Sequence, residues 1–193
     1  VVGGRNSKTP TDCNTRSLPA MLWQTLQIKT AFMKDILDKL SSYNIFNYLL
    51  PGTVFVYILK KFVGYDFIQE DLLFGGFLYY FIGMIISRIG SIFIEPFLKW
   101  TKFLKFEDYK NYISASKLDA KIELLSEVNN SYRTIVSMFI LLLISKLYKF
   151  IIEKFQIPEE NSIAFIVTML FILFIFSYRK QTNYITKRVK ANN

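Results

Sequence analysis

The distribution of charge along the chain is the feature that most limits what it can fold into. Apolar residues are gathered in four blocks, and charged residues crowd into the gaps between them. A helix needs about 20 mostly apolar residues to cross the hydrocarbon core of a bilayer, and each block has roughly that length. We therefore predict an all-α, polytopic membrane protein with about four transmembrane helices. The predicted spans are residues 41–60, 72–94, 134–152 and 161–178.

Two of the predicted spans contain residues that are unusual inside a membrane helix. Pro51 and Gly52 interrupt the first span. A proline removes one backbone hydrogen bond and favours a kink, which neighbouring helices can absorb. We favour a kinked span; the alternative is that residues 34–50 lie along the interface and the spanning helix begins at Pro51. In the third span, Lys146 and Lys149 lie in the last two turns, where long amines can reach the headgroups.

The basic residues are divided unequally between the two sides of this arrangement. Counted from residue 33, the segment before the first span, the central segment and the C-terminal tail together hold fourteen Lys and Arg. The other side has five: Lys60 and Lys61 after the first span, with Lys146, Lys149 and Lys154 around the turn between the third and fourth spans. Basic loops tend to stay in the cytoplasm, so we predict cytoplasmic N- and C-termini. The tail, residues 179–193, should lie against anionic headgroups, which attract each basic residue by about 1 kcal/mol. Its lipid-facing basic residues are Arg179, Lys180, Lys187, Arg188 and Lys190.

The first 32 residues are polar and lack periodicity. They contain no apolar run long enough for a signal peptide. We predict that residues 1–32 are a disordered extension, outside the membrane domain of residues 33–193. Met33 opens a stretch that reads like a natural start, so the extension is either a flexible cytosolic tail or an over-extended gene start.

The inventory of reactive side chains argues against an enzyme. The chain has one cysteine, Cys13, and no histidine, so the commonest zinc ligand and general base is absent. No nucleotide, hydrolase or metal motif is present, and we predict no catalytic, cofactor or metal site. The formal net charge of +9 could suggest nucleic acid, but the basic residues flank apolar blocks. Anionic lipid is therefore the expected partner, and nucleic acid is not.

The second span carries a row of small residues along one face. Glycines recur every seven residues, and a glycine–serine series recurs every four. Small residues allow two membrane helices to approach closely. The row is either a homo-oligomer contact, of the kind that can surround a pore, or a contact with another span of the same chain. Its members are Gly76, Gly83, Ser87, Gly90 and Ser91.

Arg88 is the only charge deep in the second span, and Glu95 follows seven residues later. In a regular helix residues seven apart share a face, so we predict an Arg88–Glu95 pair. An ionisable residue in a membrane segment is by default a functional hypothesis. The pair would either anchor the helix or line a polar vestibule.

The central segment, residues 97–132, is predicted to be a cytoplasmic helical segment between the second and third spans. Lysines alternate with aromatic residues at 97–106, which suits the membrane interface. Apolar residues then recur on one helical face, and the absence of Gly and Pro from 107 to 157 favours a single helix that continues into the third span. The apolar face must pack on the interfacial segment and the tail, or on a partner protein.

The stretch YNIFNYLLPG, residues 43–52, resembles the opening of a loose set of uncharacterised small bacterial multi-span inner-membrane proteins, some near antiviral defence genes. This resemblance implies a bacterial inner-membrane location. We predict a non-enzymatic, oligomeric protein that acts with a cytoplasmic partner as the membrane sensor or effector of a small system. The alternatives are a transporter or channel subunit and a structural membrane anchor.

Overall fold

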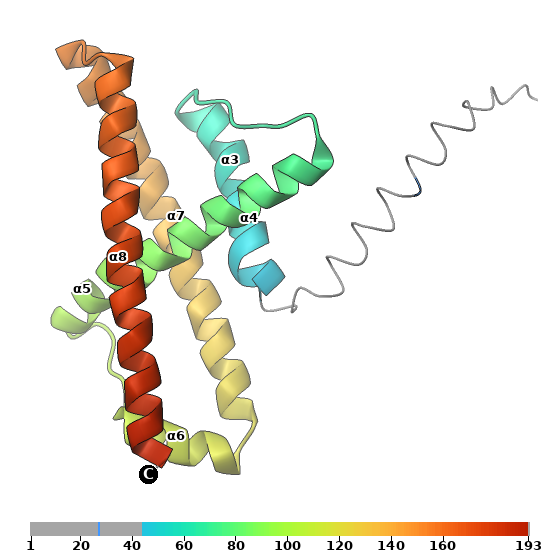
Figure 1. The fold of residues 1–193 in the computed structure, drawn as a ribbon, viewed down its shortest axis with the longest axis vertical. Coiled ribbons are helices and arrows are strands. Elements are labelled where there is room, and N and C mark those ends of the chain that lie inside the picture. The colour runs from blue at the N-terminus through green and yellow to red at the C-terminus, as the bar shows by residue number, and fades with distance from the viewer. Residues whose placement is uncertain (1–26, 28–43, 193) are drawn as a thin grey trace, which may run out of the picture. The chain divides into compact units, whose positions relative to one another are not determined.

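The structure is a computed structural model that describes Gln27 and residues 44–192. Of the predicted N-terminal extension, residues 1–32, only Gln27 is among them, so that prediction lies outside the described residues. The helices labelled in Figure 1 all belong to the second of two compact units, Leu40–Asn193. All secondary structure in the described part of this unit is helical, in agreement with the predicted all-α class.

The first helical stretch passes through a proline without a break. It consists of a π-helical segment, η1 (Ile45–Leu49), followed directly by α3 (Leu50–Phe62). The Leu50 N–H bonds to the Ile45 carbonyl, five residues earlier. This wider turn relieves the contact between the Pro51 ring and the carbonyl four residues before it. The stretch therefore crosses Pro51 and does not begin there.

The second helical stretch also contains a π-helical segment just before a proline. α4 (Leu72–Ile89) is capped by Asp71, whose carboxylate accepts a 2.9 Å hydrogen bond from the Phe74 N–H. It continues through a second π-helical segment, η2 (Gly90–Ile94), into α5 (Glu95–Trp100). In both stretches a proline is the second residue after a five-residue π segment. A π-helical turn thus accommodates a proline in each of the two stretches.

The prediction of one helix through residues 107–157 is wrong. The structure has α6 (Tyr109–Leu118) and α7 (Lys121–Phe155), and residues 101–108 separate α6 from α5. Asp119 breaks the helix with an extended backbone (φ −134°, ψ 106°), and its carboxylate accepts a 2.9 Å bond from the Lys121 N–H. Short acidic side chains compete with helices by bonding nearby backbone in this way. α7 itself runs unbroken into the third predicted span.

Among the described residues, three helices are long and apolar enough to cross a membrane, judged by length and composition. Each contains one of the three later predicted spans. The described part of the first predicted span, residues 44–60 of 41–60, falls on Asn44, η1 and α3 and is not among them. The three helices are Leu72–Trp100, Lys121–Phe155 and Glu159–Ala191.

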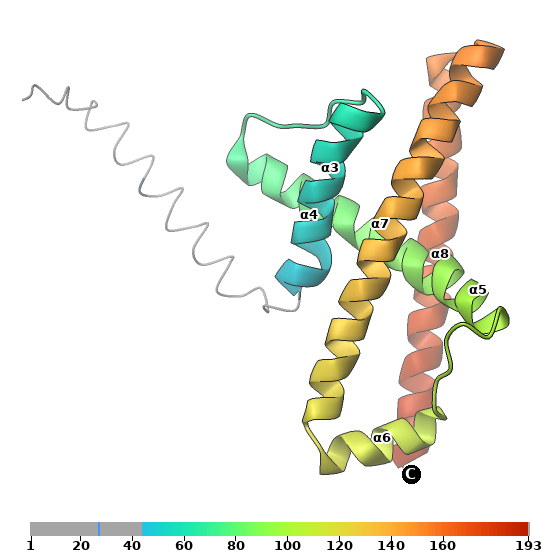
Figure 2. The same cartoon turned by 180° about the vertical axis from the view of Figure 1, so that it is seen from behind.

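α4 lies across both the η1–α3 stretch and α7, as Figures 1 and 2 show from opposite sides. α7 is followed, after a turn at Gln156, by α8 (Glu159–Asn192), which takes in the predicted basic tail as helix. α6 bridges the ends of α7 and α8 (Figure 2). The buried apolar core joins α3, α4 and α7. Its members include Val56, Leu59, Ile86, Met138 and Leu142.

Two lysines of α7 hold the end of α3. Lys146 Nζ donates to the Phe62 carbonyl at 3.1 Å, and Lys149 Nζ donates to the Val63 carbonyl at 2.8 Å. Carbonyls at a helix C-terminus lack partners within the helix and carry partial negative charge, so cations stabilise them. These two amines therefore bind protein carbonyls. Their position in the sequence had predicted contact with lipid headgroups instead.

Candidate functional site

Two helices meet at backbone contact through a pair of glycines. Gly52 of α3 lies against the Tyr79 carbonyl, and Gly83 of α4 lies against the Tyr48 carbonyl. A Cβ atom at either glycine would overlap these backbone atoms. Each glycine follows the tyrosine of its own helix by four residues, so the contact is reciprocal. We call this contact the glycine crossing.

The other small residues of the predicted row divide into two groups. Gly90 packs against Ser137 and Arg133 of α7, and Ser87 and Ser91 are buried. A Cβ at Gly76, by contrast, would meet no atom within 4 Å. Gly76 lies two turns before Gly83, close to the start of α4 and away from the glycine crossing. Most of the row thus packs within the chain, and the homo-oligomer stays a prediction.

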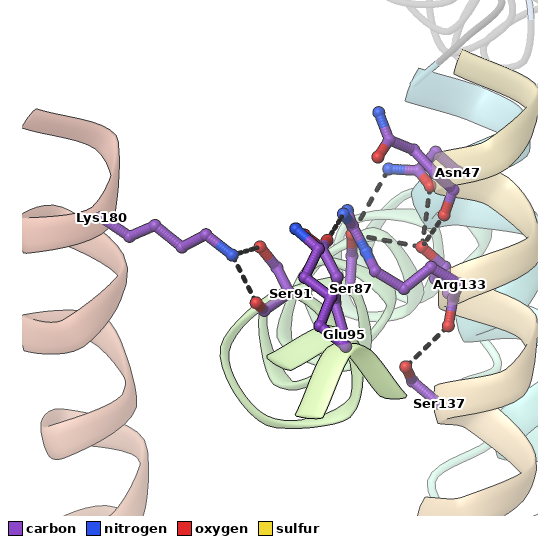
Figure 3. Close-up of polar contacts among 10 residues, drawn as sticks. Asn47, Ser87, Ser91, Glu95, Arg133, Ser137 and Lys180 are labelled. Carbon is purple, nitrogen blue, oxygen red and sulfur yellow. Dashed lines mark hydrogen bonds and ion pairs between the residues drawn. The ribbon is translucent and has the colours of Figure 1, made fainter. Parts of the chain in front are cut away.

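A buried polar contact joins three helical segments beside the glycine crossing (Figure 3). Thr134 Oγ1 of α7 lies 2.8 Å from Asn47 Oδ1 of η1 and 3.2 Å from Ser87 Oγ of α4. Asn47 Nδ2 donates to Ser87 Oγ at 3.4 Å. Asn47 and Thr134 are 0% exposed. Such bonds contribute about 0.6 kcal/mol each in membrane proteins, and they fix how the three segments align.

Glu95 is the acidic centre of a cluster of basic side chains. It is the first residue after η2, and only 8% of it is exposed. Its Oε2 accepts from Arg133 Nη1 at 2.7 Å, and its Oε1 accepts from Lys99 Nζ at 2.8 Å. A buried ion pair is costly to break, because the remaining charge loses its counter-charge and is poorly hydrated. The cluster ties the end of the second stretch to α7.

The predicted pair of Arg88 with Glu95 does not form among the described residues; Glu95 is bound by Arg133 and Lys99 instead. The prediction assumed that residues seven apart share a helical face. η2 lies between the two residues, and its wider turn rotates one away from the other. Arg88 lines the same cleft as Glu95.

α8 reaches this cluster through one lysine. Lys180 Nζ donates to Ser91 Oγ at 2.7 Å and also to the Ser91 carbonyl (Figure 3). Its electrostatic neighbours are the Glu95 carboxylate and the side chains of Arg88, Lys99 and Arg133. Of the residues predicted to face lipid, Lys180 thus contacts protein. The other four are exposed: Arg179, Lys187, Arg188 and Lys190.

The cluster opens into a cleft of about 610 Å³. Three tyrosines line one part of it: Tyr109 has its ring centroid 6.3 Å from Tyr112 and 6.4 Å from Tyr184. The cleft reaches the buried Ser87 of the polar contact. Its charged lining includes both signs, so it suits polar or zwitterionic groups. The charged residues are Arg88, Glu95, Lys99, Glu107, Asp108, Arg133 and Lys187.

Reasoning from the sequence missed the partners that complete this site. The sequence does point to Asn47, because a buried asparagine within an apolar block requires a hydrogen-bond partner. Thr134 and Arg133 look like the ordinary start of the third span, and nothing in the sequence pairs them with residues far earlier in the chain. Only the packing of α7 against α4 brings these residues together.

Within the part of the chain that the structure describes, no group of three or more Asp, Glu, Cys or His could hold a metal ion. Comparison with protein-family models, with curated proteins and with solved structures finds no match.

Proposed function

We propose that the protein is a non-enzymatic bacterial inner-membrane protein that acts with a cytoplasmic partner, as the membrane sensor or effector of a small system. The observation that carries this proposal is a row of large apolar side chains that stay exposed just before the third span. We call it the apolar stripe. It consists of Leu118, Leu124, Leu125, Val128 and Tyr132.

The apolar stripe is suited to a protein partner in water. Residues 124, 125, 128 and 132 share one face of α7, because side chains three and four apart are neighbours on a helix. Charged residues such as Lys121, Glu123 and Glu127 are interleaved with them, and hydrocarbon would not accept this density of charge. An exposed apolar helical face between charged residues commonly packs against a second helix or a groove.

We further propose four spans, with both termini in the cytoplasm. The fourth helix would be the Ile45–Phe62 stretch, whose length of roughly 27 Å nearly matches the hydrocarbon core. Its backbone contact with α4 supports this, because small-residue crossings are typical of membrane helices. The bond from Lys146 to Phe62 supports a common outer face for the end of α3 and the later part of α7.

Partner binding would reach the membrane helices through Arg133. This residue lies between Tyr132 of the apolar stripe and Thr134 of the buried polar contact. A partner that packs on the stripe would shift α7 and change the 2.7 Å pair between Arg133 and Glu95. The contact between α7 and the second stretch would change with it. This sequence of contacts gives the sensor or effector a physical route across the interface.

A transporter or channel subunit is the second candidate, favoured by the cleft that reaches buried Ser87. Beyond the polar contact, however, the side chains of Val56, Leu59 and Leu142 are buried and apolar. A single chain would therefore present an apolar barrier to ions. Ion flux in proteoliposomes at a rate proportional to protein content would favour this candidate over the partner model.

The partner is tested by photo-crosslinking in bacterial cells of the source strain. A photoreactive amino acid replaces Leu125 of the apolar stripe or, as a matched control on the same helix, Leu143; these residues are 65% and 63% exposed. We expect a discrete protein adduct from position 125 and none from position 143. Equal labelling at both positions would contradict a cytoplasmic partner. So would a result in which the only adduct has twice the mass of the chain, because that adduct is a crosslink between two copies.

The topology is tested separately by single cysteines in a Cys13→Ser background. A membrane-impermeant maleimide should label Asp66→Cys in intact cells, and should label Lys117→Cys and Lys187→Cys only after the membrane is opened. Labelling of position 187 in intact cells would overturn the proposed orientation, whatever the partner experiment gives.

A further inference from the structure

A second groove, of about 270 Å³, lies between α8 and the second helical stretch. Its apolar lining is Ile92, Pro96 and Phe176. Its polar lining comes mainly from Arg179, Lys180 and Asn183 of α8. The groove is smaller than the pockets of about 300–1,000 Å³ that enclose drug-sized ligands, so it suits a headgroup rather than a whole lipid.

The lining of this groove changes from apolar to basic along α8. Phe176 belongs to the last apolar turn of the helix, whereas Arg179, Lys180 and Asn183 lie on the following turns. Phe176 and Arg179 are both exposed, so each can contact a molecule that lies along the helix. An amphiphile with an acyl chain and a charged headgroup has the same order of chemistry.

Positive charge exceeds negative charge around the groove. The electrostatic neighbours of Lys180 are three cations, Arg88, Lys99 and Arg133, and a single carboxylate, Glu95. That carboxylate already accepts direct ion pairs from Lys99 and Arg133. The carboxylates of Glu107 and Asp108 line the larger cleft and not this groove. Uncompensated positive charge beside a membrane attracts an anion from outside the chain.

We propose that this groove binds the headgroup of one anionic phospholipid. Arg179, Lys180 and Asn183 bind the phosphate, and an acyl chain runs along Phe176 and Ile92. The Lys180 amine turns from Ser91, which it contacts at 2.7 Å, toward the phosphate. Basic pockets between membrane helices on the cytoplasmic side are known to hold anionic headgroups. The lipid thereby joins α8 to η2 and α5 of the second helical stretch, independently of any cytoplasmic partner.

The first test uses the full chain in bilayers of phosphatidylcholine with a minor fraction of spin-labelled lipid. We expect spin-labelled phosphatidylglycerol to show a larger motionally restricted fraction than spin-labelled phosphatidylcholine. The double variant Arg179→Gln/Lys180→Gln should abolish this preference. The matched double variant Arg188→Gln/Lys190→Gln removes the same charge from the same helix and should retain it. An equal loss in both variants would show diffuse attraction of the tail and overturn a single site.

The second test keeps every basic residue, so that a folding defect in the first variant cannot decide the result. Phe176→Trp is introduced with Trp23 and Trp100 replaced by phenylalanine. Phosphatidylglycerol with brominated acyl chains should quench the fluorescence of position 176 at least twofold more than brominated phosphatidylcholine at equal content. Equal quenching by the two lipids would overturn the proposal, as would displacement of the phosphatidylglycerol by millimolar inorganic phosphate.

Discussion

The η1–α3 stretch and α8 both lie against α4, but they are held there by different contacts. In the glycine crossing, backbone touches backbone at Gly52 and Gly83, and the buried Asn47 adds hydrogen bonds to the neighbouring helices. α8 is held by side chains: Phe174 stacks on Phe81 with centroids 6.0 Å apart, and Lys180 reaches Ser91.

This difference indicates how each contact responds to change. A backbone contact requires an exact approach, because neither helix can move aside without losing dispersion along its length. Long side chains at a membrane interface can adopt other conformations and exchange one partner for another. We therefore expect the η1–α3 and α4 pair to be the rigid part of the described chain. α8 should be the helix whose position depends on lipid.

The largest effect should come from breaking the glycine crossing. Gly83→Leu places a side chain where the Tyr48 carbonyl now lies, and we expect a loss of about 3 kcal/mol or more in stability, or failure to insert. Gly76→Leu is the matched control, because a Cβ there meets no atom within 4 Å. Thermal unfolding of both variants in detergent measures the difference. Similar melting temperatures would show that the crossing is not tightly packed.

A smaller effect should follow from neutralising the buried carboxylate. Glu95→Gln leaves Arg133 and Lys99 without a counter-charge, and we expect a loss of about 2 kcal/mol because the site is poorly hydrated. Glu153→Gln is the control, since Glu153 pairs with Lys149 at 3.8 Å and is exposed. An exposed pair contributes about 0.5 kcal/mol or less. Denaturant titration in micelles compares them; equal losses would contradict a special role for Glu95.

Two buried polar residues allow a direct comparison between the two regions. Asn47→Leu removes hydrogen bonds that join three helices, and should cost about 1 kcal/mol. Ser177→Ala in α8 removes only a 2.9 Å bond to Leu173 of the same helix, and should leave stability unchanged within error. The unfolding free energies of the two variants provide the measurement. A larger cost for Ser177→Ala would reverse our ranking of the two regions.

The smallest effect is expected in the loop between α3 and α4. The Lys60 amine, 2.7 Å away, and the Ile68 N–H hold the pKa of Asp66 below its ordinary value of 3.8. A lowered pKa stabilises the fold above the ordinary value, and this contribution is lost as the pH falls through the folded value. Asp66→Asn should thus lower the melting temperature slightly at neutral pH and not in strong acid. A difference that grows on acidification would show the opposite linkage.

The sequence predicted the secondary structure well where local hydropathy determines it. Three predicted spans fall inside membrane-length helices, and all secondary structure in the described residues is helical. A span in lipid must satisfy its backbone hydrogen bonds internally, so length and hydropathy suffice to predict a helix. The break at Asp119 was missed because its signal is one carboxylate that bonds the Lys121 N–H.

The candidate site was predicted only in part, and the reason is helical phase. Gly83, Ser87 and Gly90 do pack on neighbouring segments, but Glu95 has partners other than Arg88. Counting by 3.6 residues per turn fails across η2, where the turn is wider. A proline shortly after an apolar run is the only hint of that turn in the sequence, and it does not give the new phase.

The sequence alone determined that this chain consists of apolar helices with basic ends, because both properties depend on residues close together in the chain. The tertiary structure decided which faces meet. Thr134 bonds Asn47 across 87 positions, Arg133 pairs with Glu95 across 38, and Lys180 reaches Ser91 across 89. Such contacts depend on how the helices cross and on the phase of each helix at the crossing. Two π-helical turns and a pair of glycines set these quantities here.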